Sequence, residues 1–196
     1  MIHVEQIELE EGKLLYFPQF LTQSESFRYF ELFKNTISFQ QHELTLFGKK
    51  YNTPRLESFH SKENHTYTYS GNKLESKPFT EELNLLCQQI EKATNTQFNC
   101  VLMNLYRNGQ DSNGWHADNE KELGPNPVIA SLSLGASRRF DLKHNQTNET
   151  LCIDLHNGDL LWMDERIQNH YKHQIAKTKK VHESRINLTF RFIYSS

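Results

Sequence analysis

The second half of the chain is a succession of short β-rich runs, and this pattern restricts the fold more than any other feature of the sequence. Asn-Gly pairs at 108–109, 113–114 and 157–158 are strong turn signals between the runs. Eight antiparallel strands in about 100 residues are typical of a jelly roll. We therefore predict a mostly β, α+β fold built on a double-stranded β-helix. The eight runs are 98–106, 114–118, 127–135, 138–144, 149–155, 159–164, 170–176 and 185–194.

Two amphipathic helices are expected before this region. A capping box at 22–25 predicts the start of the first helix. The second opens at 78–82, with acidic residues in its first turn as the helix dipole favours. We expect both helices to pack outside the sheets, and 36–75 to be looser, with at least one hairpin. The apolar faces are Phe27, Phe30 and Phe33 in the first helix, and Leu83, Leu86, Cys87 and Ile90 in the second.

The sequence indicates one compact domain in two parts. Residues 1–97 are expected to form an N-terminal extension with the two helices, and 98–196 the β-rich core. Hydrophobic residues make up 36% and charged residues 23% of the chain, which predicts a soluble globular protein. The formal net charge of −2 does not by itself suggest a nucleic-acid binder.

The distribution of charge is more informative than the total. Seven Lys or Arg residues and one acid lie between 166 and 191, whereas the N-terminus is acidic. Such a local basic face can bind a phosphate backbone, although an ordinary solvated surface gives the same pattern.

The cysteine content and the N-terminus indicate the compartment. Three widely spaced cysteines fit buried thiols in a reducing compartment. The start of the chain does not read as a signal peptide, and no apolar run reaches membrane-spanning length. We expect a monomer in the cytoplasm, or in the nucleus of a eukaryote, with no membrane partner.

The last predicted strand separates polar from apolar side chains. Because alternate side chains of a strand point to opposite faces, Ile186, Leu188, Phe190 and Phe192 would share a core face. The other face could be solvated, as in many antiparallel sheets. Two arginines and an amide on one face also suit a planar dicarboxylate. That second face carries Arg185, Asn187, Thr189 and Arg191.

A candidate metal site precedes this strand. His116 and Asp118 are two residues apart and would share a face, and either His170 or His173 on the seventh run could supply a second imidazole. Two histidines and a carboxylate suit Fe(II) with open positions for a co-substrate and oxygen. The same set suits a zinc hydrolase, and an Asp-His pair could act as base and orienter. The predicted dicarboxylate site favours iron with an oxo-acid.

Four motifs, in this order, resemble the AlkB family over roughly 45–194: 104–109 (NLYRNG), 115–118 (WHAD), 129–135 (IASLSLG) and 185–191 (RINLTFR). Members of that family are Fe(II)/2-oxoglutarate dioxygenases that demethylate alkylated nucleic acid. The resemblance implies His116, Asp118 and His173 as iron ligands, and O2 as co-substrate. It implies 2-oxoglutarate binding by Asn104, Tyr106, Arg185, Asn187 and Arg191, with Thr189 on the same face.

The resemblance also implies a nucleotide-recognition lid. The segments 54–60 (PRLESFH) and 67–71 (YTYSG) fall at its place, with Arg55 and Tyr69 among its substrate-binding residues. Relatives often carry Trp-Tyr-Gly where this chain has 59–61 (FHS), so the base-stacking candidates are Phe59, His60 and Tyr67.

Two further places bear on the substrate. Trp115 precedes the first iron ligand, and Asn119 stands where relatives often have an acid, so it can offer a hydrogen bond but no charge. The run 44–50 (LTLFGKK) resembles a hairpin that inserts a wedge, here Phe47, into a base stack; an ordinary hairpin with Phe47 in the core is the alternative.

The expected function is oxidative demethylation of 1-methyladenine and 3-methylcytosine in DNA, a direct-reversal repair that releases formaldehyde, succinate and CO2. The alternatives are the same chemistry on RNA or tRNA, and a 2-oxoglutarate-dependent hydroxylase of protein or small molecule. A non-catalytic jelly roll that binds nucleic acid or metal is disfavoured by the intact set of ligand and arginine residues.

Overall fold

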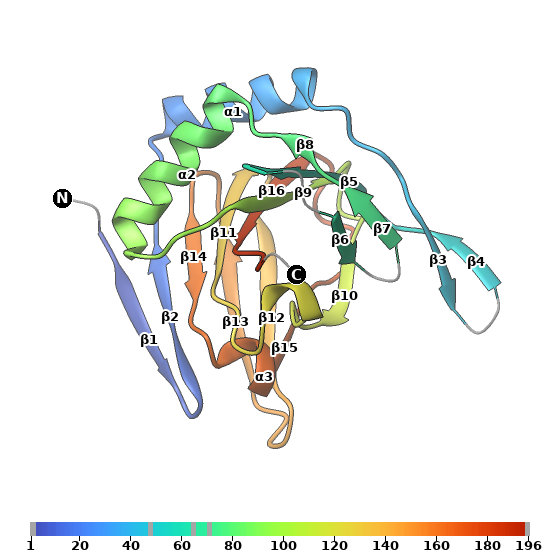
Figure 1. Ribbon diagram of the computed structural model, residues 1–196. Coiled ribbons are helices and arrows are strands. Elements are labelled where there is room, and N and C mark those ends of the chain that lie inside the picture. Colours follow the sequence, from blue (N-terminus) through green and yellow to red (C-terminus); the bar gives the residue numbers. More distant parts are fainter. Residues whose placement is uncertain (1–2, 47–48, 64–65, 70–71, 195–196) are drawn as a thin grey trace.

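The computed structural model describes residues 3–46, 49–63, 66–69 and 72–194 as two facing sheets with helices on one side (Figure 1). The larger sheet contains, in spatial order, β1 (Glu5–Leu9), β2 (Gly12–Phe17), β14 (Leu160–Met163), β11 (Ile129–Gly135), β16 (Arg185–Arg191), β9 (Cys100–Tyr106), β5 (Leu56–Ser61) and β8 (Lys77–Pro78). The smaller contains β10 (Asn113–His116), β15 (Tyr171–Ile175), β12 (Arg138–His144) and β13 (Thr150–Leu155).

The predicted jelly roll is confirmed. Each of the eight predicted runs overlaps one strand, from β9 to β16 in chain order, and only β10 begins outside its run, by one residue. The eight strands are divided equally between the two sheets, as in a double-stranded β-helix: β9, β11, β14 and β16 lie in the larger sheet and β10, β12, β13 and β15 in the smaller.

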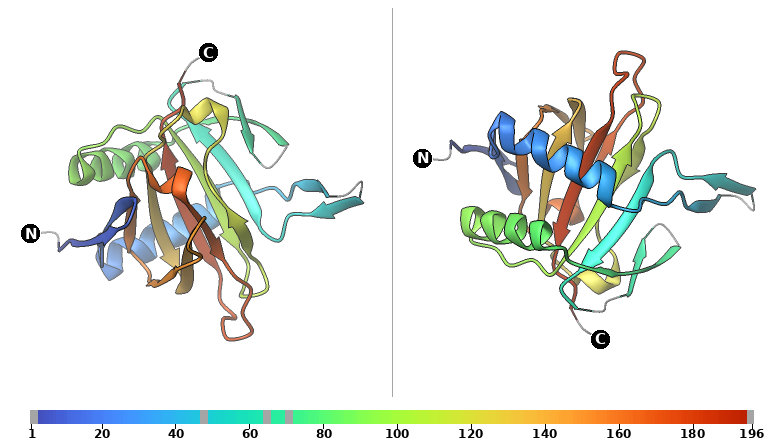
Figure 2. Two further views of the ribbon diagram at one scale, coloured as in Figure 1. Left: turned by 90° about the horizontal axis from the view of Figure 1, so that it is seen from below. Right: turned by 90° about the horizontal axis from the view of Figure 1, so that it is seen from above.

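Two helices cover the outer face of the larger sheet (Figure 2). They are α1 (Gln23–Thr36) and α2 (Glu81–Thr94), and the predicted capping box between Thr22 and Glu25 is formed. The predicted apolar face of α2 is buried throughout. The face of α1 is rotated from the prediction: Tyr29 and Phe33 are buried, whereas Phe27 is 63% exposed.

The strand β16 lies between β11 and β9 and has two different buried faces. Ile186, Leu188 and Phe190 enter the core beneath the helices, as predicted. Phe192 does not, because the strand ends at Arg191 and the ring is 37% exposed. The opposite, polar face of the strand is also buried. This excludes one of the two alternatives from the sequence, a polar face exposed to solvent.

Four strands of the larger sheet come from the first 97 residues: β1, β2, β5 and β8. The segment 54–60 was expected in a lid, but most of it forms β5, which pairs along β9 from Leu56 to Ser61. Its polar sequence does not reveal a buried strand, because its burial depends on a distant partner.

The remaining elements are short. Hairpins are formed by β3 (Glu43–Leu46) with β4 (Lys49–Asn52) and by β6 (Thr66–Tyr69) with β7 (Asn72–Glu75), and the first projects from the body of the molecule (Figure 1). A 3₁₀ turn, η1 (Lys121–Leu123), follows β10, and α3 (Ile167–His170) precedes β15. Among the described residues, no helix has the length and apolar character needed to cross a bilayer.

Candidate active site

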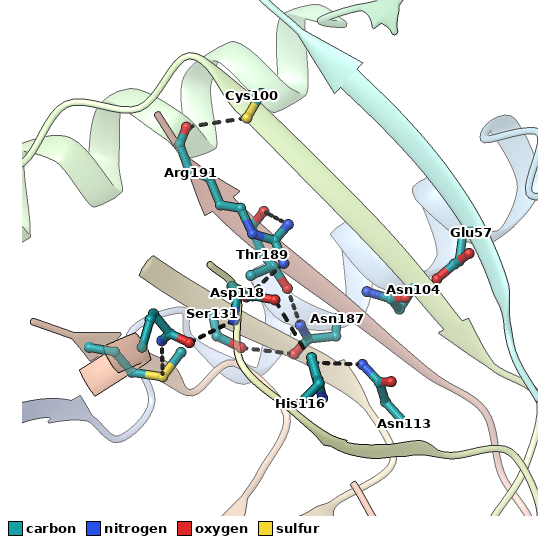
Figure 3. Close-up of polar contacts among 12 residues, drawn as sticks. Glu57, Cys100, Asn104, Asn113, His116, Asp118, Ser131, Asn187, Thr189 and Arg191 are labelled. Carbon is teal, nitrogen blue, oxygen red and sulfur yellow. Dashed lines mark hydrogen bonds and ion pairs between the residues drawn. The ribbon is translucent and has the colours of Figure 1, made fainter. Parts of the chain in front are cut away.

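Three metal-ligand side chains converge between the two sheets. His116 ends β10 and His173 lies directly opposite it on β15, so the antiparallel register brings the two rings to a centroid distance of 4.2 Å. Asp118 follows β10 and turns toward the larger sheet (Figure 3). The ligand atoms of the three residues all lie within 4.8 Å of one another. The sequence left His170 and His173 open, and the register selects His173.

The protonation of these groups suits a divalent cation. Burial and the neighbouring His116 lower the pKa of His173 to about 3, so its imidazole is neutral at physiological pH. Burial alone would raise the pKa of Asp118, but Arg191 and the two imidazoles outweigh it and hold the pKa well below its usual range. Neutral imidazoles and an ionised carboxylate are the forms that bind metal.

Two buried atoms of this cluster have no hydrogen-bond partner. Within the described part of the chain, they are Asp118 Oδ1 and His173 Nδ1. Buried polar atoms are normally satisfied, and a cation bound by the cluster would satisfy the carboxylate oxygen. The residues present therefore fit Fe(II), the metal that two histidines and a carboxylate bind with open positions.

Second-sphere contacts orient the ligands. The His116 Nδ1 atom lies 2.7 Å from the Gly114 carbonyl oxygen and donates to it, which leaves Nε2 as the metal-facing nitrogen. The Asn113 amide lies 2.9 Å from that Nε2. The Asp118 backbone N–H donates to Oε1 of Gln168, a fully buried side chain of α3, over 2.9 Å.

The polar face of β16 forms the wall beside this cluster. Arg185 donates through Nη2 to Ser133 Oγ at 2.9 Å and to Asn187 Oδ1 at 2.6 Å, and Asn187 donates to Thr189 Oγ1 at 2.7 Å. Arg191 donates to Asp118 Oδ2 at 2.7 Å. The strand thus carries one arginine beside the metal ligands and a second one six residues away along the same face.

Arg185 carries unused donors into the pocket. Its side chain is 1% exposed, and burial lowers its pKa to about 10. Its Nε and Nη1 atoms have no acceptor among the described residues, and the guanidinium lies 5.4 Å from the centre of the Tyr106 ring. A buried cation with free donors is strongly favourable only when an anion, such as a carboxylate, binds it.

The pocket contains every metal and 2-oxoglutarate residue predicted from the sequence. It encloses about 440 Å³ of empty space, part of it at an open mouth. The sequence interpretation missed Asn113, Ser131, Phe140, Met163 and Ile175 in its lining. Alternation of polar and apolar residues along 129–135 could have identified Ser131. It lies opposite Thr189 in the strand pair β11–β16, so both side chains point into the pocket. Phe140 stacks on His173, with ring centres 5.3 Å apart.

The predicted substrate residues are scattered. Trp115 is 43% exposed and Asn119 is exposed, both beside the metal ligands. Phe59 instead packs in a small core cluster with Leu102, and it does not line the pocket. His60 pairs with Val101 and so lies on the opposite face of the sheet from the pocket.

For three predicted substrate residues the structure does not describe the side chain, and a fourth is buried and not on the surface. Phe47 lies outside the described residues, and for Tyr67 and Tyr69 the backbone alone is described, in β6. Arg55 is 2% exposed and lies beside the pocket, where it contacts Asn104, and not on a surface lid.

His170, the alternative ligand, belongs to a second cluster. Its Nδ1 and His144 Nε2 both contact Glu11 Oε2, at 2.5 Å and 3.0 Å. The Thr147 backbone N–H donates to His144 Nδ1, so the proton of neutral His144 must sit on Nε2 and point at Glu11. A metal-binding histidine has the reverse arrangement, in which the other ring nitrogen donates. This cluster is therefore a hydrogen-bonded link between β1–β2, β12 and α3.

One cavity contains both a candidate cation site and a candidate anion site. One end could hold a cation through His116, Asp118 and His173, and the other could hold an anion through Arg185. A bidentate oxo-acid that chelates the metal and places its second carboxylate near Arg185 would satisfy both ends.

Comparisons with known proteins agree with this geometry. Residues 13–191 match the 2OG-Fe(II) oxygenase superfamily. Human DNA oxidative demethylase ALKBH2 is 36% identical over 156 residues, which cover 76% of this chain and 60% of the human protein. Bovine alpha-ketoglutarate-dependent dioxygenase alkB homolog 3 is 39% identical over 154 residues, covering 74% and 53%. The chain thus spans about half to two thirds of the length of these relatives.

A solved structure shares the fold. The structure of OsALKBH1 superimposes with a TM-score of 0.66 at 16% identity and covers 94% of this chain and 100% of that one. Together, the family match over most of the chain, the identity to two alkB homologues and the convergence of the ligand residues give one conclusion. This chain belongs to the AlkB family of 2-oxoglutarate and Fe(II)-dependent oxygenases.

Proposed function

We propose that this protein oxidatively demethylates N-alkylated bases in DNA, with 1-methyladenine and 3-methylcytosine as its substrates. The observation that carries the proposal is the presence, in one pocket, of a three-residue cation site and a buried arginine with free donors. When bound, Fe(II), 2-oxoglutarate and O2 would hydroxylate the N-methyl group; the oxo-acid leaves as succinate and CO2, and the hydroxymethyl group leaves the base as formaldehyde.

The side chains of the chain bind and orient in this scheme. His116, Asp118 and His173 would hold the metal on one side and leave the other side open. Arg191, next to Asp118, would pair with the oxo-acid carboxylate nearest the metal, and Arg185 with the distant one. Burial raises the pKa of Tyr106, so its phenol stays neutral and can donate a hydrogen bond to the co-substrate.

The surface next to the pocket supports a nucleic-acid substrate. The loop after β15 exposes Lys177, Lys179 and Lys180, and together with Arg138 and Arg139 it lines a basic hollow. Hydrogen bonds between Gly109 and both Thr178 and Val181 fix the loop against the turn after β9. Exposed lysines at a fixed position can neutralise phosphates along a strand. The relatives named as DNA oxidative demethylases favour DNA as the first substrate to test.

Flipping of the base is a part of the proposal, because the methylated N1 or N3 edge faces the partner strand in a duplex. Phe47 lies in the sequence between the two strands of the projecting β3–β4 hairpin, and we propose it as the residue that fills the gap. A Phe47→Ala variant should lose more activity on duplex than on single-stranded DNA; equal loss on both would rule out the wedge.

The test of the function uses a panel of oligonucleotides with single methylated bases, in DNA and in RNA, with Fe(II) and 2-oxoglutarate. Product mass and succinate are measured, and Asp118→Ala is the control. We expect methylated DNA to stimulate succinate formation in the wild type alone. Faster turnover of methylated RNA would move the assignment to RNA, and no stimulation by any methylated oligonucleotide would overturn it in favour of a protein or small-molecule hydroxylase.

A further inference from the structure

A buried ion pair lies beside the co-substrate pocket, on the same face of the larger sheet as the pocket residue Asn104. Arg55 immediately precedes β5, and its Nη2 atom lies 2.7 Å from Oε1 of Glu57. Both side chains are 3% exposed. Removing two charges from water is costly, so a buried pair at this place calls for a specific role beyond stability.

The guanidinium of Arg55 reaches a pocket residue. Its Nε–H donates to Asn104 Oδ1 over 2.9 Å. Asn104 is at the centre of β9, where it pairs with Glu57 on one side and with Asn187 on the other. In Figure 3 the Asn104 amide nitrogen points toward Asn187, and Glu57 lies on the opposite side. Arg55 therefore contacts the amide from the β5 side, opposite to Asn187.

This contact fixes the polarity that Asn104 presents. A carboxamide has an acceptor oxygen and a donor nitrogen, and a half-turn exchanges them. Arginine has donors alone, so the oxygen of Asn104 must face Arg55 and the NH2 group must face the pocket. A dicarboxylate needs donors, and a flipped amide would present an oxygen lone pair to a carboxylate oxygen.

Glu57 and Ser112 hold Arg55 in this position. Glu57 balances the charge of Arg55 in an ion pair with Nη2, while Nη1 donates to the Ser112 carbonyl oxygen over 3.4 Å. Ser112 directly precedes β10, the strand that ends at His116. The orientation of Asn104 is thus tied to the strand that carries a metal ligand.

We propose that Arg55 is a positioning residue for the co-substrate, which holds the Asn104 amide with Nδ2 toward the 2-oxoglutarate carboxylate near Arg185. The inference rests on the proposed 2-oxoglutarate site. It replaces the role in the nucleotide lid expected from the sequence, and it predicts that Arg55 affects the affinity for 2-oxoglutarate and not the affinity for the nucleic acid.

The experiment measures 2-oxoglutarate binding to the Mn(II)-loaded protein by calorimetry. The variant Arg55→Met/Glu57→Gln removes both charges and leaves no uncompensated carboxylate. We expect its Kd for 2-oxoglutarate to rise about tenfold, the size of one lost hydrogen bond to a charged group, with less than about a twofold change in the Kd for a methylated oligonucleotide. The exposed Arg28→Met is the matched control and should leave both constants unchanged.

A double-mutant cycle separates positioning from general damage. If Arg55 acts through Asn104, adding Asn104→Ala to the double variant should weaken 2-oxoglutarate binding no further than Asn104→Ala alone, within about twofold. Arg55→Lys, which keeps one donor, should recover part of the affinity. Additive losses, or equal weakening of oligonucleotide binding, would overturn the inference.

The same measurement distinguishes failure of the proposed 2-oxoglutarate site from failure of the role proposed for Arg55. If the wild-type Mn(II) protein does not bind 2-oxoglutarate, both the proposed function and this inference are overturned. If the wild type binds it and the Arg55→Met/Glu57→Gln variant, folded by circular dichroism, binds it equally well, the proposed function stands and the positioning role of Arg55 is rejected.

Discussion

Arg191 and Asp118 form a buried ion pair that joins the two sheets at the metal site. Nη2 of Arg191 lies 2.7 Å from Oδ2 of Asp118, and the side chains are 3% and 1% exposed. The second carboxylate oxygen, Oδ1, has no hydrogen-bond partner among the described residues. One oxygen of Asp118 is therefore held by Arg191 of β16, and the other is left for a metal.

Replacing Arg191 should test whether its guanidinium balances the charge of Asp118 when no metal is bound. Removal of one partner of a buried pair costs about 3–5 kcal/mol, because a charge is left buried alone. We expect Arg191→Met to lower the free energy of unfolding by that order without metal, and Mn(II) to restore more stability to the variant than it adds to the wild type. Urea unfolding with and without Mn(II) measures both. Equal stabilisation by Mn(II) would show that Arg191 does not balance the charge of Asp118.

The two candidate histidines should behave oppositely toward metal. His173→Ala should abolish the binding of one equivalent of Fe(II) or Mn(II), because His173 faces His116 across the strand pair. His170→Ala should leave one equivalent bound, since His170 contacts Glu11. Calorimetric titration with Mn(II) gives the stoichiometry. Two equivalents in the wild type, reduced to one in His170→Ala, would instead make the Glu11 cluster a metal site.

These histidines show what the sequence could predict and what it could not. Alternation placed Arg185, Asn187, Thr189 and Arg191 on one face, and the structure puts all four in the pocket lining. The choice between His170 and His173 could not come from local spacing, because both lie in one predicted run, 170–176, although in the structure His170 ends α3 and His173 lies on β15. It depends on the register with β10, which is a tertiary property.

The segment around β5 was expected in a lid and instead forms a strand of the larger sheet, and the sequence did not show this for a related reason. Its residues are polar, and polar residues usually indicate a surface loop. Here they are buried because β9 pairs along the whole strand, and because Arg55 and Glu57 neutralise each other beside the pocket. A single sequence does not contain the partner strand, so a buried polar strand and a surface lid look alike.

The three thiols should differ sharply in reactivity. Burial raises the pKa of Cys87 and of Cys100 to about 12, and both side chains are inaccessible. Cys152 is exposed on β13. Titration with a thiol-disulfide reagent at neutral pH should modify one cysteine in the native protein and three in denaturant. Cys152→Ala should remove the native reaction; a second thiol reacting at a similar rate would contradict the burial of the other two.

The ionised carboxylate of Glu11 should stabilise the folded state, and this stabilisation should disappear when the carboxylate is protonated in acid. The hydrogen bond from His144, with the charge of His170, lowers the pKa of Glu11 below 4.5. A carboxyl with a lowered folded pKa stabilises the native state above the unfolded value, and the effect disappears as the pH falls through the folded value. Glu11→Gln should therefore unfold at lower urea than the wild type at pH about 5, and the gap should shrink toward pH about 3. The exposed Glu165→Gln is the control. A gap that stays constant over this range would show that the link between Glu11 and the two histidines does not depend on the carboxylate charge.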